Sequence, residues 1–345
     1  MAMHPDFKKL ERSSLTVPPE KAGERLDVFL HGQWPDYSRT LLAGLIKEGH
    51  VEVQGLSATR VKPALKLEAG QQITINRPEL TAAQDLQPED IPLDVLFEDE
   101  ALIVINKPAA LAVHPARAGH GGTLANALLF HAGKVSRADT FRPGIVHRLD
   151  ADTSGVIVCA KDESAHFKLA EQFEKRTVEK EYLAIVRGRL RQASGTIELP
   201  IGRHPDHYEM QRVHAEGKPA VTAYEVIEYF RRFTFVRLKP STGRTHQLRV
   251  HLAAIQHPIV SDRLYSKRPE LTLSEVREDE LVPGEPPLIA RQALHAAKLS
   301  FNHPRTGQRM TFEAPLPLDF ARTLQALQTH SPWKAEGKPT DEPQA

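Results

Sequence analysis

The stretch Gly144–Lys161, GIVHRLDADTSGVIVCAK, sets an acidic block between two apolar runs. The runs are Ile145–Val146 and Val156–Ala160. Apolar, β-branched residues favour strands, whereas the Asp, Thr, Ser and Gly residues between the runs favour a turn. The sequence therefore predicts a loop that leaves a buried strand, presents Arg148 and Asp150, and returns to the core. Rigid elements that hold such a loop are a common setting for an active site.

The composition is that of an ordinary globular protein. The 345 residues are 40% hydrophobic and 26% charged, enough for two domains and a large core. There is no apolar run of about 18 residues and no apolar core near the N-terminus, so we expect no membrane partner and no signal peptide. The single cysteine, Cys159, excludes an internal disulfide and lies in an apolar run, which predicts a buried thiol in a reducing, cytoplasmic compartment.

Charge is balanced overall but segregated along the chain. The net charge is +1, which by itself is weak evidence for a nucleic-acid partner. Residues 79–101 contain eight acids and no Lys or Arg, whereas basic residues predominate from 231 to 268. A basic surface is therefore compatible with the neutral average.

The pattern of turns, prolines and apolar periodicity divides the chain into segments. A small α/β unit precedes a larger α+β domain whose many strands and few helices predict a mainly antiparallel sheet. The expected boundaries are a disordered N-terminus at 1–16, the small unit at 17–78, an acidic linker at 79–92, the large domain at 93–330 with an inserted loop at 268–290, and a disordered tail at 331–345.

Apolar spacing locates the elements inside these domains. We expect helices that begin at Arg25 and Arg39 in the small unit, the second with Ser38 as its N-cap and Gly49 as its stop. In the large domain we expect helices at 123–131, 163–176, 245–255 and 318–327, and strands at 101–106, 178–186, 196–200, 221–229, 233–239, 295–301 and 309–313.

The block His147–Gly155, HRLDADTSG, resembles the catalytic motif of the RluA family of RNA pseudouridine synthases. Two further segments are similar to motifs of this family: Lys180–Gly188, KEYLAIVRG, and Ser241–Leu252, STGRTHQLRVHL, which is followed by HPIVSDRLY. The resemblance covers roughly residues 20–320. It implies the pseudouridine synthase catalytic fold, a mixed, mainly antiparallel sheet flanked by helices and loops.

The same resemblance implies the roles of individual residues. Asp150 matches the family nucleophile, Tyr182 the residue that packs on the uracil and can help to remove its C5 proton, and Arg249 the arginine that pairs with the nucleophile. A helix through Thr245 and Arg249 would place these two on one face. The supporting site residues implied by the motifs are His147, Arg148, Thr153, Ser154, Gly155, Arg244, Thr245, His246 and Gln247.

The implied reaction determines what equipment is needed. Converting uridine to pseudouridine breaks an N-glycosidic bond, rotates the uracil and forms a carbon–carbon bond, without gain or loss of atoms. A carboxylate beside the anomeric carbon can attack it or stabilise its charge. We therefore expect no cofactor and no metal. His246 and His251 are five residues apart in a predicted helix, a poor spacing for a shared ion.

Flipping the uridine out of its stack has a free-energy cost, and Arg148 beside the nucleophile is the expected wedge or phosphate contact. Two further residues bear on these motifs: an acid at a variable position, and a serine that departs from the family pattern. Asp152 is a second acid at a variable position of the motif, where turn capping is its expected role. Ser261 replaces a family glycine before Asp262, which puts a left-handed turn conformation in doubt.

The small unit resembles the alpha-L RNA-binding module, which is shared with ribosomal protein S-four. The similarity rests on RLD at Arg25, the Ser38–Arg39 start, VEVQG at Val51–Gly55 and the ending LEAGQQITI. The resemblance implies that the second helix and the following hairpin face RNA. The implied RNA-binding residues are Arg25, Ser38, Arg39, Lys47, Arg60 and Lys62.

Several functions stay open at this point. The module favours large-subunit ribosomal RNA, as in the RluC and RluD branches, over transfer RNA, and we expect a monomer. A non-catalytic RNA-binding or ribosome-assembly factor is the alternative of another class. A retaining glycosidase-like enzyme would need a second catalytic carboxylate, for which only Asp152 is nearby.

Overall fold

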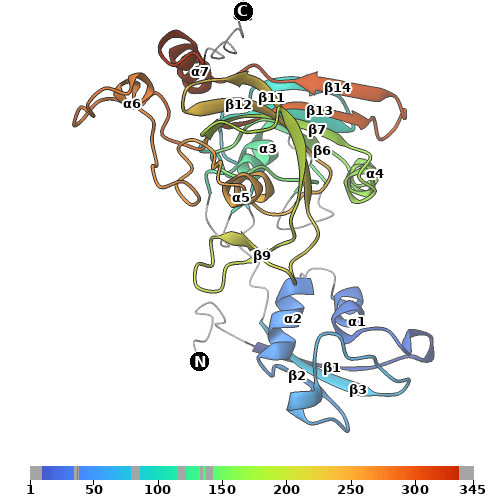
Figure 1. Ribbon diagram of the computed structural model, residues 1–345. Coiled ribbons are helices and arrows are strands. Elements are labelled where there is room, and N and C mark those ends of the chain that lie inside the picture. The colour runs from blue at the N-terminus through green and yellow to red at the C-terminus, as the bar shows by residue number, and fades with distance from the viewer. Residues whose placement is uncertain are drawn as a thin grey trace, which may run out of the picture. The chain divides into compact units, whose positions relative to one another are not determined.

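The computed structural model describes residues 10–34, 37, 39–78, 86–115, 121–132, 135–136 and 143–333 (Figure 1). The chain divides into two compact units, Met1–Asp85 and Leu86–Ala345. The division falls inside the predicted acidic linker. Among the described residues, no helix is long and apolar enough to cross a membrane.

The first unit packs two helices against a three-stranded antiparallel sheet. The helices are α1 (Leu26–Gln33) and α2 (Arg39–Lys47), and the strand order is β1-β3-β2, with β2 at Val51–Val53 and β3 at Gln72–Pro78. Both predicted helices are confirmed, and the second one ends before Gly49, which has the left-handed φ of 83° expected of a helix stop. Short 3-10 turns lie at Pro19–Lys21 and Ala58–Arg60.

The N-terminal segment is not disordered throughout, so this prediction is wrong for its second half. Strand β1, Leu10–Thr16, pairs along its whole length with β3. Its sequence, LERSSLT, contains only two apolar residues, of which Leu15 packs against the core. An edge strand held mainly by main-chain hydrogen bonds leaves little hydrophobic pattern in the sequence.

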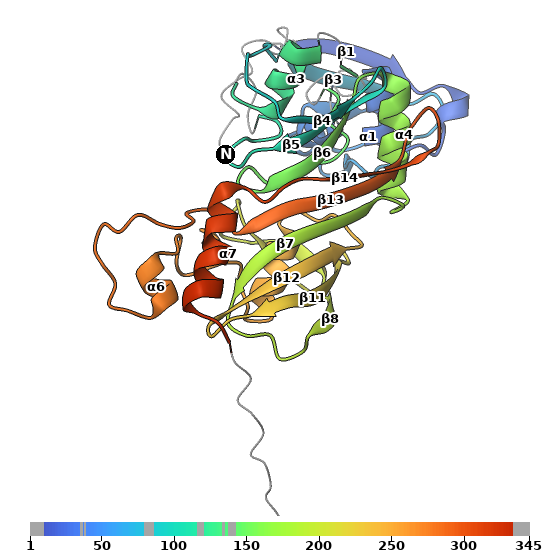
Figure 2. The same cartoon turned by 90° about the horizontal axis from the view of Figure 1, so that it is seen from above.

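The second unit is built on one large sheet (Figure 2). The order is β4-β5-β6-β13-β7-β12-β11-β8, with β14 paired to β13, and the one parallel pairing among the described strands is β13 with β6. The α+β class with a mainly antiparallel sheet is thus confirmed. The strands are β4 Val95–Glu98, β5 Leu102–Lys107, β6 Ser154–Ala160, β7 Glu179–Arg187, β8 Ser194–Glu198, β11 Val221–Tyr229, β12 Phe233–Pro240, β13 Leu294–Asn302 and β14 Arg309–Glu313.

Alternation along the neighbouring strands β5 and β6 explains how both faces of this half of the sheet are covered. On β5, Ile103 and Ile105 join the cluster under helix α3 (Leu124–Ala132), whereas Leu102 and Val104 join the cluster under helix α4 (Glu163–Glu174). Cys159 on β6 faces the first of these clusters and is fully buried, as the sequence predicts. Burial raises the pKa of its thiol.

Two further helices cover the other half of the sheet. Helix α5 (Gln247–Ala254) contributes Leu248 and Leu252 to the core, and helix α7 (Leu318–His330) contributes Phe320, whose ring centroid lies 6.1 Å from that of Phe235 on β12. A short pair of strands, β9 (Ile201–Arg203) and β10 (Gln211–Val213), forms a separate hairpin.

The predicted linker at 79–92 belongs in part to the second unit. Leu86 and Ile91 pack against the cluster under α3, and the Glu89 carboxylate accepts a 2.9 Å hydrogen bond from the Gly122 main chain. The side-chain amide of Asn126 also donates to the main-chain oxygen of Gln87. The acidic, proline-containing composition concealed these few apolar anchors.

The insertion and the tail are also more ordered than predicted. Within 268–290 a short helix, α6 (Leu273–Arg277), forms, and Leu271, Val276 and Ile289 are buried in the main core. The tail prediction is wrong at its start, because Pro332 bridges Phe230 and the Trp333 ring packs edge-on to Tyr229.

Candidate active site

The acidic loop leads into a buried strand as its sequence predicts, but the strand predicted before the loop does not form. Before it, Ile145 forms only a single bridge with Cys159 rather than a full strand; after it, β6 begins at Ser154. The Thr153 main chain donates to the main-chain oxygen of Asp150, which closes the turn. Gly155 follows with a φ of 114°, and a Cβ there would lie 2.1 Å from the Ala296 oxygen, so only glycine fits.

A buried lysine fastens the loop to the neighbouring strand. Lys107, at the end of β5, is fully buried, and its Nζ donates to the main-chain oxygens of Pro108 at 2.7 Å, Leu111 at 2.9 Å and Ala151 at 2.9 Å. Burial lowers the pKa of Lys107 to about 7, while three carbonyl acceptors match the three N–H bonds of an ammonium group. Because Ala151 directly follows Asp150, the hydrogen bond from Lys107 fixes the main chain that carries the Asp150 carboxylate.

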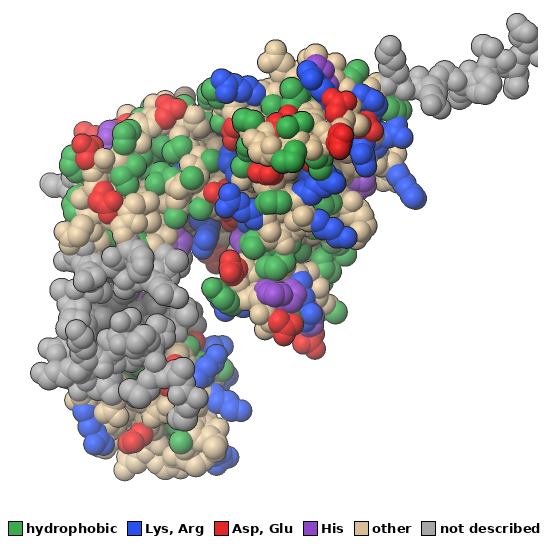
Figure 3. Space-filling view, turned by 90° about the vertical axis from the view of Figure 1, so that its left-hand side faces the viewer, with side chains coloured by type: hydrophobic (Ala, Val, Ile, Leu, Met, Phe, Trp, Pro, Cys, Tyr) green, Lys and Arg blue, Asp and Glu red, His purple; other side chains and the backbone are tan. Residues whose placement is uncertain are grey.

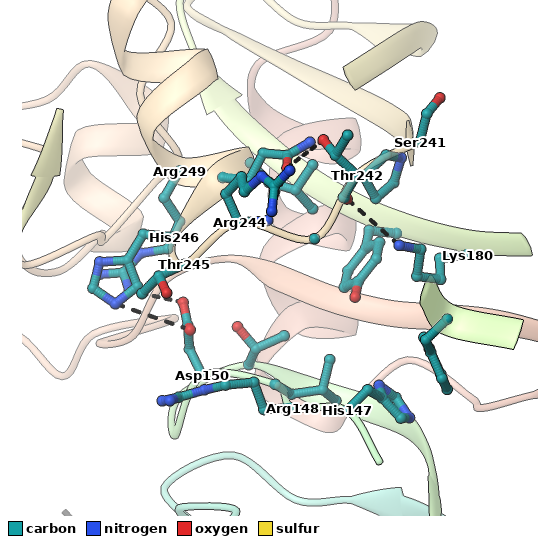
Figure 4. Close-up of a pocket in the computed structure, with 18 of the residues that line it drawn as sticks. His147, Arg148, Asp150, Lys180, Ser241, Thr242, Arg244, Thr245, His246 and Arg249 are labelled. Carbon is teal, nitrogen blue, oxygen red and sulfur yellow. Dashed lines mark hydrogen bonds and ion pairs between the residues drawn. The ribbon is translucent and has the colours of Figure 1, made fainter. Parts of the chain in front are cut away.

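Asp150 is joined to Arg249 as the resemblance implies (Figure 4). Nη1 of Arg249 lies 2.9 Å from Oδ2 of Asp150. The Asp150 side chain is 20% exposed to solvent, whereas the Arg249 side chain is only 6% exposed. His246 Nε2 lies 3.9 Å from the other carboxylate oxygen. The Asp150 carboxylate is therefore held by Arg249 on one side and exposed to the pocket on the other.

The other edge of Arg249 is held by a second carboxylate, that of Asp262. Nε and Nη2 of Arg249 donate to Asp262 at 2.7 and 2.8 Å, a bidentate pair with a fully buried acid. Burial opposes the charge of Arg249, but the hydrogen bonds and attraction of Asp262, and then of Asp150, raise the pKa of the guanidinium above its ordinary value. Arg249 is thus a rigid, permanently charged clamp.

Tyr265 completes this support. Its ring centroid lies 5.2 Å from Cζ of Arg249, and its hydroxyl contacts Nδ1 of His246 at 2.9 Å. Burial raises the pKa of Tyr265 to about 12 and lowers the pKa of His246. The sequence prediction assigned no role to Asp262 and Tyr265, although the segment HPIVSDRLY, which contains both, carried the resemblance.

The loop before α5 positions Arg244, Thr245 and His246. The predicted helix from Thr245 is wrong at its start, because His246 has a left-handed φ of 54° and α5 begins at Gln247. The side chain of Gln247 replaces the missing turn: Oε1 accepts from Thr242 at 2.7 Å and from the Arg244 main chain at 3.0 Å. Its amide donates to the Val221 oxygen, so the loop is fixed to the sheet.

Tyr182 faces the same pocket from β7. Burial, and then the negative charge of Asp150, raise the pKa of its phenol. Lys180, two residues earlier on the same strand, donates to the Thr242 oxygen at 3.4 Å, and burial and nearby Arg176 lower its pKa. The register of β7 with β12 sets Tyr182 opposite Leu238, beside the loop that carries Thr242.

His147 supports the pocket from below rather than acting in it. Its Nε2 accepts a hydrogen bond from the Val158 main chain at 3.1 Å, and its ring stacks on Phe173 with centroids 4.4 Å apart. Burial, together with the charge of Lys180, lowers its pKa to about 3. His147 is therefore neutral, and its accepting nitrogen is already used.

These elements enclose a pocket of about 490 Å³ with Asp150, Tyr182 and Arg249 in its wall. The volume suits a nucleoside-sized ligand. Cationic side chains line it as well, and the Arg148 side chain is exposed beside Asp150. The cations that line the pocket besides Arg249 are Arg148, Arg176, Lys180 and Arg244.

Not every predicted supporting residue reaches this pocket. His147, Arg148, Thr153 and the segment 244–247 line it, whereas Ser154 and Gly155 do not. The Ser154 hydroxyl instead contacts Nδ1 of His295 at 3.0 Å in the core. Asp152 contributes its main-chain oxygen to Arg291.

The predicted RNA-binding residues lie in the first unit. Lys47, Arg60 and Lys62 are exposed, and Arg25 is half-exposed but already paired with Asp27 at 2.9 Å. Ser38 and the side chain of Arg39 lie outside the described residues.

The histidines near the site are engaged by protein groups. His251 contacts the Leu199 oxygen at 2.9 Å and the Thr222 hydroxyl at 3.0 Å. Within the described parts of the chain, no group of three or more His, Cys, Asp or Glu side chains is arranged to hold a metal ion.

Comparison with known proteins identifies this architecture. Residues 101–254 match the family model of RNA pseudouridylate synthases. Ribosomal large subunit pseudouridine synthase D of Nitrosomonas europaea is 44% identical over 316 residues, which cover 91% of this chain and 87% of the relative. The protein of the same name from Escherichia coli K12 is 41% identical over 319 residues, covering 90% and 93%.

A solved structure agrees in fold. Human RNA pseudouridylate synthase domain containing 4 has a TM-score of 0.53 and 28% identity, covering 68% of this chain and 92% of the human one. The similarity to the RluA family noted from the HRLDADTSG block extends over most of the chain, and the protein belongs to the RNA pseudouridine synthase family.

Proposed function

We propose that this protein isomerises uridine to pseudouridine in large-subunit ribosomal RNA, with Asp150 as the acting carboxylate. The observation that carries the proposal is the geometry of Asp150, which Arg249 grips at 2.9 Å while one side stays open to a nucleoside-sized pocket. The bacterial relatives are named ribosomal large subunit pseudouridine synthases, and this supports large-subunit ribosomal RNA as the substrate.

Asp150 would act on the sugar carbon as the glycosidic bond breaks. It either attacks that carbon or assists loss of a sugar proton, and both routes need the carboxylate rather than the carboxylic acid. Arg249 is the charged partner that orients it. No atom enters or leaves in the overall conversion, so the residues of the pocket suffice.

Tyr182 fits a packing role better than a basic one. Burial raises the pKa of its phenol, so the hydroxyl stays protonated near neutral pH. The ring can pack on the uracil while the hydroxyl serves as a hydrogen-bond donor. The cations that line the pocket would receive the phosphates of the flipped nucleotide, with Arg148 at the exposed edge.

The first unit would add affinity for RNA through Lys47, Arg60 and Lys62. Removing residues 1–85 should weaken RNA binding and reduce its salt dependence, because each lost phosphate contact lowers the slope by about 0.7. The catalytic unit should stay folded, since it has its own core. Equal affinity and equal slope without the first unit would refute this role.

Pseudouridine mapping tests the proposal in cells. Large-subunit RNA from cells that lack the gene should be missing pseudouridine at one or more positions, and the wild-type gene should restore it. An unchanged map would favour a non-catalytic ribosome-assembly factor, and a loss confined to transfer RNA would change the substrate. A ribosomal substrate would place the protein in the cytoplasm, where we expect it to act as a monomer.

A further inference from the structure

A second hollow lies in the catalytic unit, apart from the Asp150 pocket. It has a volume of about 420 Å³ and shares no lining residue with that pocket. It forms where β7 ends and β12 begins, since Arg187 pairs with Phe233 across the two strands. Figure 3 views the side of the molecule that carries α6, where Lys and Arg side chains gather around a few acids. We call this second hollow the arginine hollow. Its lining includes Arg187, Arg231, Arg232, Arg268, Phe233 and Glu275.

The arginine hollow has an excess of positive charge. Glu275, the one acid in its lining, accepts from Nη1 of Arg187 at 2.6 Å and lies 3.0 Å from Nη1 of Arg268. At the rim, Glu278 lies 3.4 Å from Arg231. Arg232 makes no ion pair within the described part of the chain, and its side chain is exposed. Two carboxylates therefore face four guanidinium groups.

Arg187 has unused hydrogen-bonding capacity. Its Nε and Nη2 are buried and have no partner among the described residues. In Arg249, the same two nitrogens of the guanidinium group donate to the carboxylate of Asp262. A buried donor without an acceptor has a free-energy cost, more so in a charged group. An oxyanion in the hollow would supply the acceptors once the guanidinium turns toward it.

We propose that the arginine hollow binds a phosphate group. Planar guanidinium forks recognise phosphate in a bidentate manner, and a cluster of them suits an anion with several oxygens. Arg187 lies five positions after Tyr182 on β7, a distance of about 17 Å along the strand. The phosphate is therefore either part of the backbone of an RNA seated in the Asp150 pocket or a free ion. The first source rests on the proposed function, and the second does not.

The test compares two double variants of the full-length chain. Arg232→Gln with Arg268→Gln removes two exposed charges from the hollow. Arg305→Gln with Arg309→Gln is the matched control, because these exposed arginines lie beyond Ser300, which pairs with Glu179 at the opposite end of β7. Calorimetric titration with inorganic phosphate should show affinity weakened by about tenfold in the first variant and unchanged in the control.

A second arm measures the salt dependence of binding to a large-subunit RNA transcript. A slope reduced by about 0.7 or more in the hollow variant alone identifies the RNA backbone as the source. Weakened phosphate binding with an unchanged slope identifies a free ion. If neither quantity changes, or if both double variants change equally, the proposal is overturned. Neither readout requires isomerisation, so a failure of the proposed function would not be mistaken for a failure of this site.

Discussion

Nη1 of Arg249 donates a 2.9 Å hydrogen bond to Oδ2 of Asp150, which lies 99 residues earlier in the chain. The guanidinium is itself held on its other edge by Asp262, which in turn accepts hydrogen bonds from the main chain of Leu264 and Tyr265. The direction in which Asp150 points therefore depends on a turn that does not touch the pocket.

Asp262→Asn should disable the site without removing any pocket residue. The amide cannot accept both N–H bonds of Arg249, so the clamp loses its orientation and a buried cation loses its main partner. We expect kcat to fall more than about tenfold with little change in KM, and stability to fall by about 3 kcal/mol. Single-turnover assays and urea unfolding measure the two effects.

Glu313→Gln, which breaks the exposed pair with Lys298, is the control and should change stability by less than about 1 kcal/mol. An unchanged kcat in Asp262→Asn would contradict the positioning role.

Lys107→Met should loosen the catalytic loop. The substitution keeps the volume but leaves the oxygens of Pro108, Leu111 and Ala151 without their shared donor. Unsatisfied buried groups should reduce stability by at least about 2 kcal/mol, and the altered position of Asp150 should reduce turnover. Lys168→Met, at an exposed position on α4, is the matched control for urea unfolding and turnover. Equal stability of the two variants would show that Lys107 does not anchor the loop.

Stability should fall as the pH drops from about 7 to 5. Burial holds the pKa of His147 at about 3, below the value of about 6.5 in an unfolded chain. Only the unfolded state then gains a proton in this range, and the stability that the neutral form contributes above pH 6.5 is lost toward pH 3. His147→Gln should flatten the pH dependence of the urea midpoint, whereas His207→Gln, at an exposed position, should not. Identical pH profiles for His147→Gln and the wild type would rule out this titration.

Ser261 adopts the left-handed conformation that its position in the motif requires. Its φ is 58°, and its hydroxyl donates to the Ile289 oxygen at 3.0 Å, a contact that a glycine could not make. Ser261→Ala keeps the strained backbone and loses the hydrogen bond, so it should lower stability by about 1 kcal/mol and Tm by about 2 °C. Ser261→Gly relieves the strain and should stay closer to the wild type. An alanine variant as stable as the wild type would show that the hydroxyl contributes nothing.

The sequence predicted most of the elements that position the site, and the reasons are local. The continuous apolar runs of β5 and β6 and the glycines beside the turns can be recognised without the fold. The three segments of the site, around Asp150, Tyr182 and Arg249, were identified by their motifs. That they lie around one pocket follows from the order of the strands, which the sequence did not predict.

What the sequence did not predict depends on contacts between distant segments. The pairing of β1 with β3 and the burial of Ile289 leave no periodic pattern. The clamp of Asp262 on Arg249 and the hydrogen bond from Lys107 to Ala151 join residues on different elements. A single sequence shows such a lysine or aspartate only as a charge beside an apolar run.

The most direct test of the central claim is quantitative pseudouridine mapping of a large-subunit RNA transcript incubated with the purified protein or with its Asp150→Asn variant. The substitution keeps the shape of the side chain and removes the charge that Arg249 orients. We predict pseudouridine at one or more positions with the wild-type protein and none with Asp150→Asn, which should still bind the transcript. Pseudouridine formed by Asp150→Asn at the wild-type rate would contradict the account.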